Sequence, residues 1–229
     1  MVERGCKLYR TVYILSRVIE NTAMSRRGDK LREHILYVAK DVFLELGFER
    51  ASMDVVASRA ETSKRSLYAH FESKEKLFLA VIELVRGLFL SKLKMPGDYS
   101  EKPAEALVMF CGRYLEILLF APSIRMCRLS IAEAARFPEG SAQHFEVIFS
   151  AVHERLSVYL KGIFGLSAKV SAEAARKLLG EVIFPRFPRA LFGMDELAES
   201  FDDDVIAENF DLKPIRKAVA SLLESLGQH

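Results

Sequence analysis

Apolar side chains recur every three to four residues along most of this 229-residue chain, which is the spacing of one face of an α-helix. Pro96 and Gly97 interrupt this pattern and divide the chain into two parts. The first part has the pattern of several short helices, and the second part has longer apolar stripes. We therefore predict an all-α fold with a small N-terminal helical domain and a larger C-terminal one.

Two short helices in the first part are separated by a gap of only three residues. The first is predicted to begin near Ser52, the gap covers residues 61–63, and the second helix covers residues 64–70. This second helix offers only Leu67 and Phe71 to a core. A helix that buries so little and follows such a turn is typical of a helix-turn-helix, in which the second helix lies in the major groove of DNA.

The outer face of that second helix carries the donors that DNA recognition needs. Hydroxyls and cations lie at its N-terminal end, where base edges are contacted, and aromatic or cationic side chains suited to phosphate oxygens follow. Ser52 is first of all a helix N-cap, with a phosphate contact as a second role. The candidate DNA-binding residues are Ser52, Thr62, Ser63, Lys64, Arg65, Ser66, Tyr68, His70 and Lys74.

Three motifs follow one another between Ile35 and Ile82: Leu-Gly-Phe at the end of one helix, Ser-Met-Asp at the start of the next, and Ser-Lys-x-x-Leu-Tyr-x-His-Phe-x-Ser-Lys-Glu-x-Leu. Together they resemble the DNA-binding domain of the TetR/AcrR transcriptional regulators. The resemblance implies a homodimer that binds double-stranded operator DNA, with base reading at residues 63–66. The turn glycine of the family is replaced by Glu61, so we expect a non-glycine residue with positive φ there.

The resemblance also suggests domain boundaries. We predict the helix-turn-helix domain at residues 25–75 and an effector-binding and dimerisation domain at residues 76–229. Residues 1–24 form an N-terminal extension with two alternative interpretations. Because Met24 opens a segment of the kind with which such regulators commonly start, the residues before it are either an upstream translation of the reading frame or a genuine amphipathic helix. That helix would be lined by Leu8, Val12, Leu15 and Ile19.

In the C-terminal part, we expect helices over residues 104–120, up to about Arg136, from about Ser141, from Ser171, and from Pro214 to the end. Prolines are expected to stop or break the helices before them. The resemblance implies that two helices of this part, paired with the same two of a second chain, form the dimer interface.

The same part is rich in phenylalanine and has few charges that are candidates for burial. Its apolar stripes are typical of a packed core, and in this family they also line a ligand cavity. We expect a mainly apolar or amphipathic effector that releases a repressor from its operator, with an arginine or histidine fixing a polar end. The candidate ligand-binding residues are Arg113, Tyr114, Arg125, Met126, Ile131, Phe145, Phe149 and His153.

Other classes of protein find little support in the sequence. We find no catalytic motif, so we predict that the protein is not an enzyme and needs no cofactor. His144 and His153 would lie on opposite faces of a helix, which makes them a poor metal-binding pair. No apolar run approaches the roughly 18 residues of a membrane span, and three scattered cysteines fit a cytoplasmic protein. The alternative function is a helical protein-interaction scaffold, or a ligand-binding protein without operator-specific binding.

Overall fold

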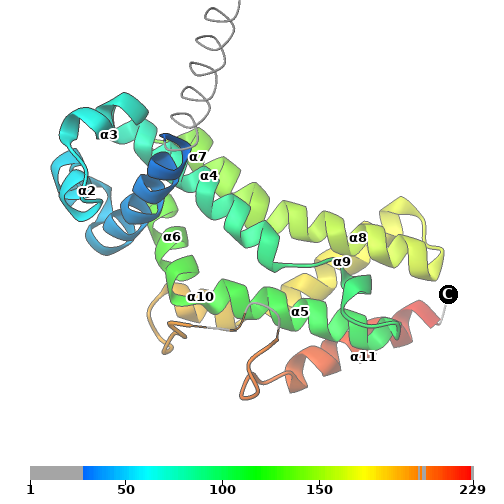
Figure 1. The fold of residues 1–229 in the computed structure, drawn as a ribbon. Helices are drawn as coiled ribbons and strands as arrows, with labels where there is room; N and C mark the ends of the chain where they lie inside the picture. The colour runs from blue at the N-terminus through cyan, green and yellow to red at the C-terminus, as the bar shows by residue number, and fades with distance from the viewer. Residues whose placement is uncertain (1–27, 201, 203–204, 228–229) are drawn as a thin grey trace, which may run out of the picture. The chain divides into compact units, whose positions relative to one another are not determined.

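The computed structural model describes residues 28–200, 202 and 205–227. Helices dominate this described part, which contains no β-strand and only an isolated bridge between Phe120 and Ala198 (Figure 1). The predicted all-α fold is thus confirmed. Two compact units divide between Val81 and Ile82, inside helix α4 (Lys74–Lys92). The predicted extension up to residue 24 lies outside the described residues, and the predicted domain boundary at residue 75 stays a prediction.

The first unit consists of a helix over residues 28–50, then α2 (Met53–Arg59), α3 (Lys64–His70) and the start of α4. Gly47 has a φ of +75°, the left-handed conformation, which glycine adopts without steric cost. The core of this unit is built around three phenylalanine rings. Phe43 and Phe48 each place their ring centroid 5.1 Å from that of Phe78, in edge-to-face contacts.

The second unit is arranged around α5 (Pro103–Leu119), most of whose side chains are buried. The elements of this unit after α4 are η1 (Pro96–Asp98), α5, α6 (Ala121–Ala132), α7 (Pro138–Phe145), the π-helical turn η2 (Glu146–Ser150), α8 (Ala151–Phe164), α9 (Ala168–Ile183), α10 (Arg186–Leu191) and α11 (Lys213–Gly227). α5 contacts η1, α6, α9, α10 and α11, so it lies at the centre of the core (Figure 1).

Two helix boundaries differ from the prediction, and the second differs because prolines start helices as well as stopping them. The helix predicted to reach about Arg136 ends at Ala132, and the one predicted to begin near Ser141 begins at Pro138. Proline lacks an N–H group, but the first turn of a helix does not need one. For the same reason Pro188 lies inside the short helix α10. Pro214 does occupy the first turn of α11, as predicted.

A buried ion pair ties α5 to its surroundings. The Arg113 guanidinium lies 2.8 Å from the Glu116 carboxylate, and the two side chains are only 2% and 5% exposed. The other Glu116 oxygen accepts a hydrogen bond from the Ala207 backbone N–H at 2.8 Å. Arg113 and Arg155 also donate to the Lys92 and Leu93 carbonyls at the end of α4. These contacts hold the last turn of α4 and the segment around Ala207 on the core.

Candidate DNA-binding surface and ligand cavity

Helices α2 and α3 form the predicted helix-turn-helix, and each begins with a serine N-cap. The Ser52 hydroxyl accepts a hydrogen bond from the Val55 N–H at 3.2 Å, and the Ser63 hydroxyl accepts one from the Ser66 N–H at 3.1 Å. In the turn between them Glu61 has a φ of +49°. The expected departure from glycine is confirmed, and it costs about 1–2 kcal/mol of backbone strain.

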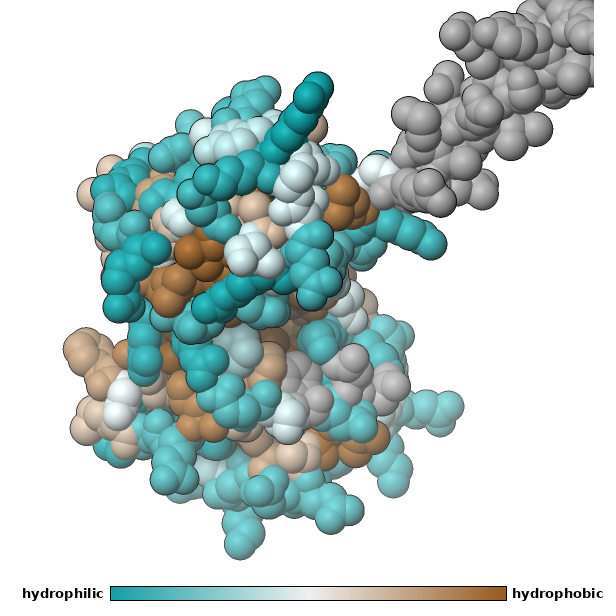
Figure 2. All heavy atoms as spheres, turned by 60° about the vertical axis from the view of Figure 1, so that its left-hand side comes forward, coloured by the Kyte–Doolittle hydropathy of each residue, from teal (hydrophilic) through white to brown (hydrophobic). Residues whose placement is uncertain are grey.

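The outer face of α3 is left free of the core, as its sequence predicted. Leu67 and Phe71 point inward and are 0% and 4% exposed. Lys64, Arg65 and Tyr68 are exposed on the other side of the helix. Seen from the side on which α2 and α3 lie in Figure 1, the molecular surface is largely hydrophilic with smaller hydrophobic patches (Figure 2).

The candidate DNA-contacting residues differ in how far their polar groups are already engaged. Ser52 and Ser63 use their hydroxyls as N-caps. The Lys64 ammonium lies 2.7 Å from the Asp54 carboxylate, but both side chains are more than 60% exposed, so this pair contributes at most about 1 kcal/mol. Lys64 therefore remains available to an incoming phosphate or base. Thr62, Ser66 and His70 are half-buried at the edges of the same face.

Lys74 is placed differently from the phosphate-contacting role that its motif suggested. Its ammonium donates to the carbonyl oxygens of Phe48, Ala51 and Glu49, at 2.9, 3.1 and 3.4 Å, and lies 4.2 Å from the centroid of the Phe48 ring. These carbonyls belong to the end of the first helix and the link to α2, where helical partners are missing. An ammonium has three donors, and all three are directed to the backbone. In this structure Lys74 is a structural residue.

Replacing Lys74 by methionine is expected to lower the free energy of unfolding by about 1–3 kcal/mol, because the carbonyl oxygens lose a charged donor while the apolar stem is kept. Urea denaturation measures the effect. Lys76→Met, at an exposed position in the same helix, is the matched control and should change stability by less than about 0.5 kcal/mol. Equal stability of the two variants would contradict the structural role.

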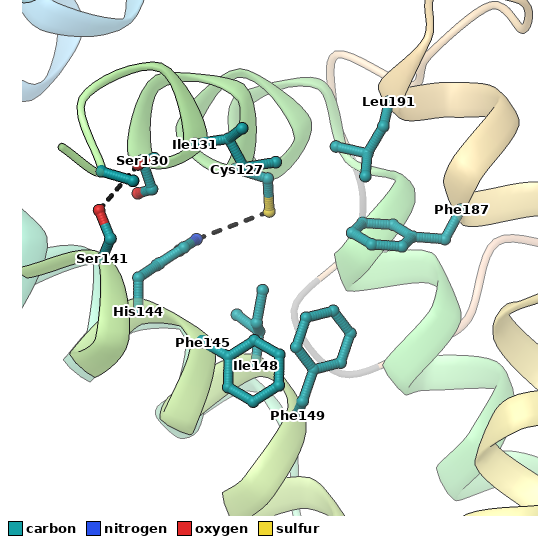
Figure 3. Close-up of a pocket in the computed structure, with 11 residues that line it drawn as sticks. Cys127, Ser130, Ile131, Ser141, His144, Phe145, Ile148, Phe149, Phe187 and Leu191 are labelled. Atoms are coloured by element: carbon teal, nitrogen blue, oxygen red, sulfur yellow. Dashed lines mark hydrogen bonds between the residues drawn. The ribbon is translucent and has the colours of Figure 1, made fainter. Parts of the chain in front are cut away.

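A half-open cavity of about 280 Å³ lies in the second unit, lined by residues of α6, α7, η2 and α10 (Figure 3). Figure 3 shows Cys127 and Ile131 on one wall, His144, Ile148 and Phe149 on another, and Phe187 and Leu191 on a third. Every side chain that lines it is apolar or uncharged, with one histidine. The lining residues are Cys127, Ser130, Ile131, Ala134, Ser141, His144, Phe145, Ile148, Phe149, Phe187 and Leu191.

Two polar side chains in this lining are buried without satisfying all their hydrogen-bonding atoms. Ser130 and His144 are each 5% exposed, and neither Ser130 Oγ nor His144 Nδ1 has a hydrogen-bond partner. The other ring nitrogen of His144 lies 3.5 Å from Cys127 Sγ. Burial lowers the pKa of His144 to about 4 and raises the pKa of Cys127 to about 12. Near neutral pH the imidazole is therefore uncharged and the thiol is protonated.

Only part of the predicted ligand-binding set reaches this cavity. Ile131, Phe145 and Phe149 line it. The other five candidates lie elsewhere. Arg113 forms the buried ion pair with Glu116, Arg125 forms a surface pair with Glu199, and Met126 is in the core. The Tyr114 hydroxyl donates to the Ile148 carbonyl at 2.9 Å, and His153 Nε2 lies 2.8 Å from the Ala172 carbonyl oxygen.

Ser130 and His144 were missed by the sequence analysis. A signal was present, because Cys127, Ser130, Ile131 and Ala134 follow one helical face and include two polar groups within an otherwise apolar stripe. For His144, the sequence indicated only that it would form a poor metal-binding pair with His153. Among the described residues, no three His, Cys, Asp or Glu side chains gather closely enough to hold a metal ion. None of the described helices is long and apolar enough to cross a membrane.

Comparison with known proteins finds two separate family matches, one in each unit of the chain. Residues 35–81 match the family described as bacterial regulatory proteins, tetR family, and residues 105–212 match the AefR-like transcriptional repressor, C-terminal domain. The transcriptional activator FasR of Mycolicibacterium smegmatis is 44% identical over 64 residues, covering 26% of this chain and 29% of FasR. The transcriptional repressor NicS of Pseudomonas putida is 31% identical over 93 residues, covering 39% of this chain and 44% of NicS.

The chain thus spans less than half the length of these curated relatives. Likeness to solved structures extends further. The structure of the flavonoid-responsive regulator FrrA superposes with a TM-score of 0.65 at 26% identity, covering 87% of this chain and 96% of FrrA. This chain and FrrA therefore share their fold along nearly the whole length of FrrA.

Proposed function

Because the chain belongs to the TetR family of transcriptional regulators, whose members are DNA-binding proteins and not enzymes, we propose that it is a cytoplasmic repressor that binds operator DNA as a homodimer. The match of residues 105–212 to a repressor C-terminal domain supports repression. The observation that carries DNA binding is α3, which keeps only Leu67 and Phe71 for the core and exposes the rest of its polar face.

In the proposed complex α3 lies in the major groove. Arg65 and Lys64, at the N-terminal end of the helix, contact base edges, and Tyr68 and His70 contact phosphate oxygens. Two such helices in a dimer require two half-sites about one helical turn of DNA apart. The proposed operator is accordingly a near-palindrome, and phosphate contacts make its affinity depend steeply on salt.

The dimer is proposed to use α9 and α11, which pack against each other. Their outer faces include the exposed residues Gly180 and Ala220. A Cβ atom added to Gly180 would meet nothing within 4 Å. Small residues of this kind let helices of a second chain approach closely. Phe184 at the end of α9 is 70% exposed and supplies apolar area that a partner would cover.

The cavity is proposed to bind the small molecule that releases the repressor. Its apolar walls favour a largely apolar ligand, and ligand response is a property of the relative FrrA, which is named as responsive to flavonoids. The factor by which a ligand lowers the affinity for the operator can be no larger than the ratio of the ligand's own affinities for the DNA-free and DNA-bound forms of the protein. Release therefore requires a cavity that differs between the two forms.

The test begins with an operator selected from a random duplex pool and measured by mobility shift. We expect Arg65→Ala to relax preference at one base position by about 1–3 kcal/mol, because a bidentate base contact is lost. Tyr68→Phe should weaken all sequences alike, since a phosphate contact carries no base information. Lys161→Ala, at an exposed position of α8, is the control. Binding that never distinguishes one duplex from another would favour the alternative, a ligand-binding or scaffold protein.

A further inference from the structure

An exposed ion pair joins the two helices of the helix-turn-helix. Asp54 lies in the first turn of α2, and Lys64 is the first residue of α3. A carboxylate oxygen of Asp54 lies 2.7 Å from the Lys64 ammonium, and the two side chains are 62% and 64% exposed. Arg65, the next residue of α3, has no hydrogen-bond or ion-pair partner among the described residues. The pair therefore restrains one of the two cations at this end of α3 and leaves the other free.

The donors of the Lys64 ammonium decide which partners it can hold at the same time. An ammonium has three donors. A lysine that reads guanine in the major groove donates to O6 and N7 of the base, which uses two of them. The third donor remains for Asp54, so the ion pair and the base contact can exist together. Because both guanine atoms are uncharged acceptors, Asp54 stays the counter-ion of Lys64 in such a complex.

A phosphate contact has a different effect on the pair, because a DNA phosphate carries a full negative charge. If Lys64 turns to a phosphate, Asp54 loses its counter-ion beside an anionic backbone. If the pair stays intact, the Asp54 carboxylate repels a phosphate that approaches the ammonium. Asp54 thus penalises the use of Lys64 on the backbone, which is the same in every sequence. An exposed pair of this kind sets the scale of the penalty at about fivefold in affinity.

We propose that Asp54 is a positioning residue for sequence recognition, which holds the Lys64 ammonium for a guanine and withholds it from phosphates. It acts through its contact with Lys64 and needs no contact with DNA of its own. The inference rests on the proposed function, because it concerns how α3 distinguishes the operator from other DNA. Removing the Asp54 charge should therefore strengthen binding to unrelated DNA and leave the affinity for the operator unchanged.

Asp54→Asn tests the inference, because it removes the charge and keeps the size of the side chain. The affinities of the full chain for the selected operator and for an unrelated duplex of equal length are measured by mobility shift at several salt concentrations. We expect the variant to bind the unrelated duplex about fivefold more tightly than the wild type does. Its log affinity for that duplex should fall more steeply with log salt, by about 0.9, because one more phosphate is neutralised.

Two further variants show whether the effect passes through Lys64. Lys64→Met should lose the preference for guanine at one operator position. In that background, adding Asp54→Asn should change neither the base preference nor the salt dependence. Asp41→Asn is the matched control for net charge. Asp41 is 67% exposed and lies 2.8 Å from the Lys40 ammonium, in the first helix of the same unit, and its replacement should leave both affinities unchanged.

An unchanged ratio of operator affinity to unrelated-duplex affinity in Asp54→Asn would overturn the inference and leave the proposed function standing. The same holds for an equal gain of affinity for both duplexes, or for a gain that persists in the Lys64→Met background. In either case the carboxylate would act on the DNA directly and not through Lys64. A wild-type chain that binds every duplex alike would contradict the proposed function itself, and the inference would fall with it.

Discussion

Replacing Glu116 by leucine is expected to lower the free energy of unfolding by about 3–5 kcal/mol. The carboxylate is buried 2.8 Å from the Arg113 guanidinium and also accepts the Ala207 N–H. Removing the carboxylate takes a close partner away from a guanidinium whose charge stays in the core, and this costs more than the intact pair contributes to stability. Urea denaturation followed by circular dichroism measures the change.

Two further variants separate this explanation from simple loss of packing. The double variant Arg113→Met/Glu116→Leu removes both charges and should recover most of the lost stability, because a buried pair and an apolar replacement are often nearly equal in free energy. Glu105, also in α5, forms an exposed pair with Arg216 of α11. Glu105→Leu breaks this pair and should lower the free energy of unfolding by less than about 1 kcal/mol. A double variant no more stable than Glu116→Leu would show that the charges are not the cause.

Stability should also fall as the pH drops from about 6.5 to about 4, because of His144. Its pKa in the folded protein is lowered to about 4 by burial, from an ordinary value of 6.5. Between these values the unfolded chain binds a proton that the folded protein does not, so acid favours unfolding. This contribution to stability is fully present above pH 6.5 and is lost as the pH falls to 4. The total loss is about 3 kcal/mol.

The free energy of unfolding at several pH values, compared between the wild type and His144→Leu, isolates this effect. The variant should lose stability less steeply between pH 6.5 and 4. His34→Leu, at an exposed position in the first unit, should retain the slope of the wild type. If wild type and His144→Leu have parallel profiles, the buried neutral histidine does not govern acid stability.

The sequence predicted those features that depend on residues close together in the chain. The bounds of α3, its anchors Leu67 and Phe71, and the positive φ of Glu61 follow from spacing and turn chemistry within a few residues, and all are confirmed. The role of Lys74 depends on carbonyls more than twenty residues earlier in the chain, and no local pattern indicates them.

The ligand candidates show the same limit. Arg113 was chosen as a cation in an apolar helix, but a carboxylate three residues later was a visible partner on the same helical face. Ser130 and His144 come from different helices and become neighbours of one cavity only through packing. The unsatisfied state of their polar atoms is a property of the folded structure and cannot be read from residue types.

The π-helical turn Glu146–Ser150 joins α7 to α8 without a break in the helix. Such a turn holds one residue more than an α-helical turn. Deleting one residue there would close it as an α-helical turn and leave α7 facing the same way, whereas deleting one residue inside α8 would rotate α7 by about 100°. Leu156 and Leu160 would keep their places in the core, and His144 and Phe145 would stay turned toward the cavity. This turn is therefore the one place between α7 and α8 where the chain can lose a residue without turning the lining side chains of α7 away from the cavity.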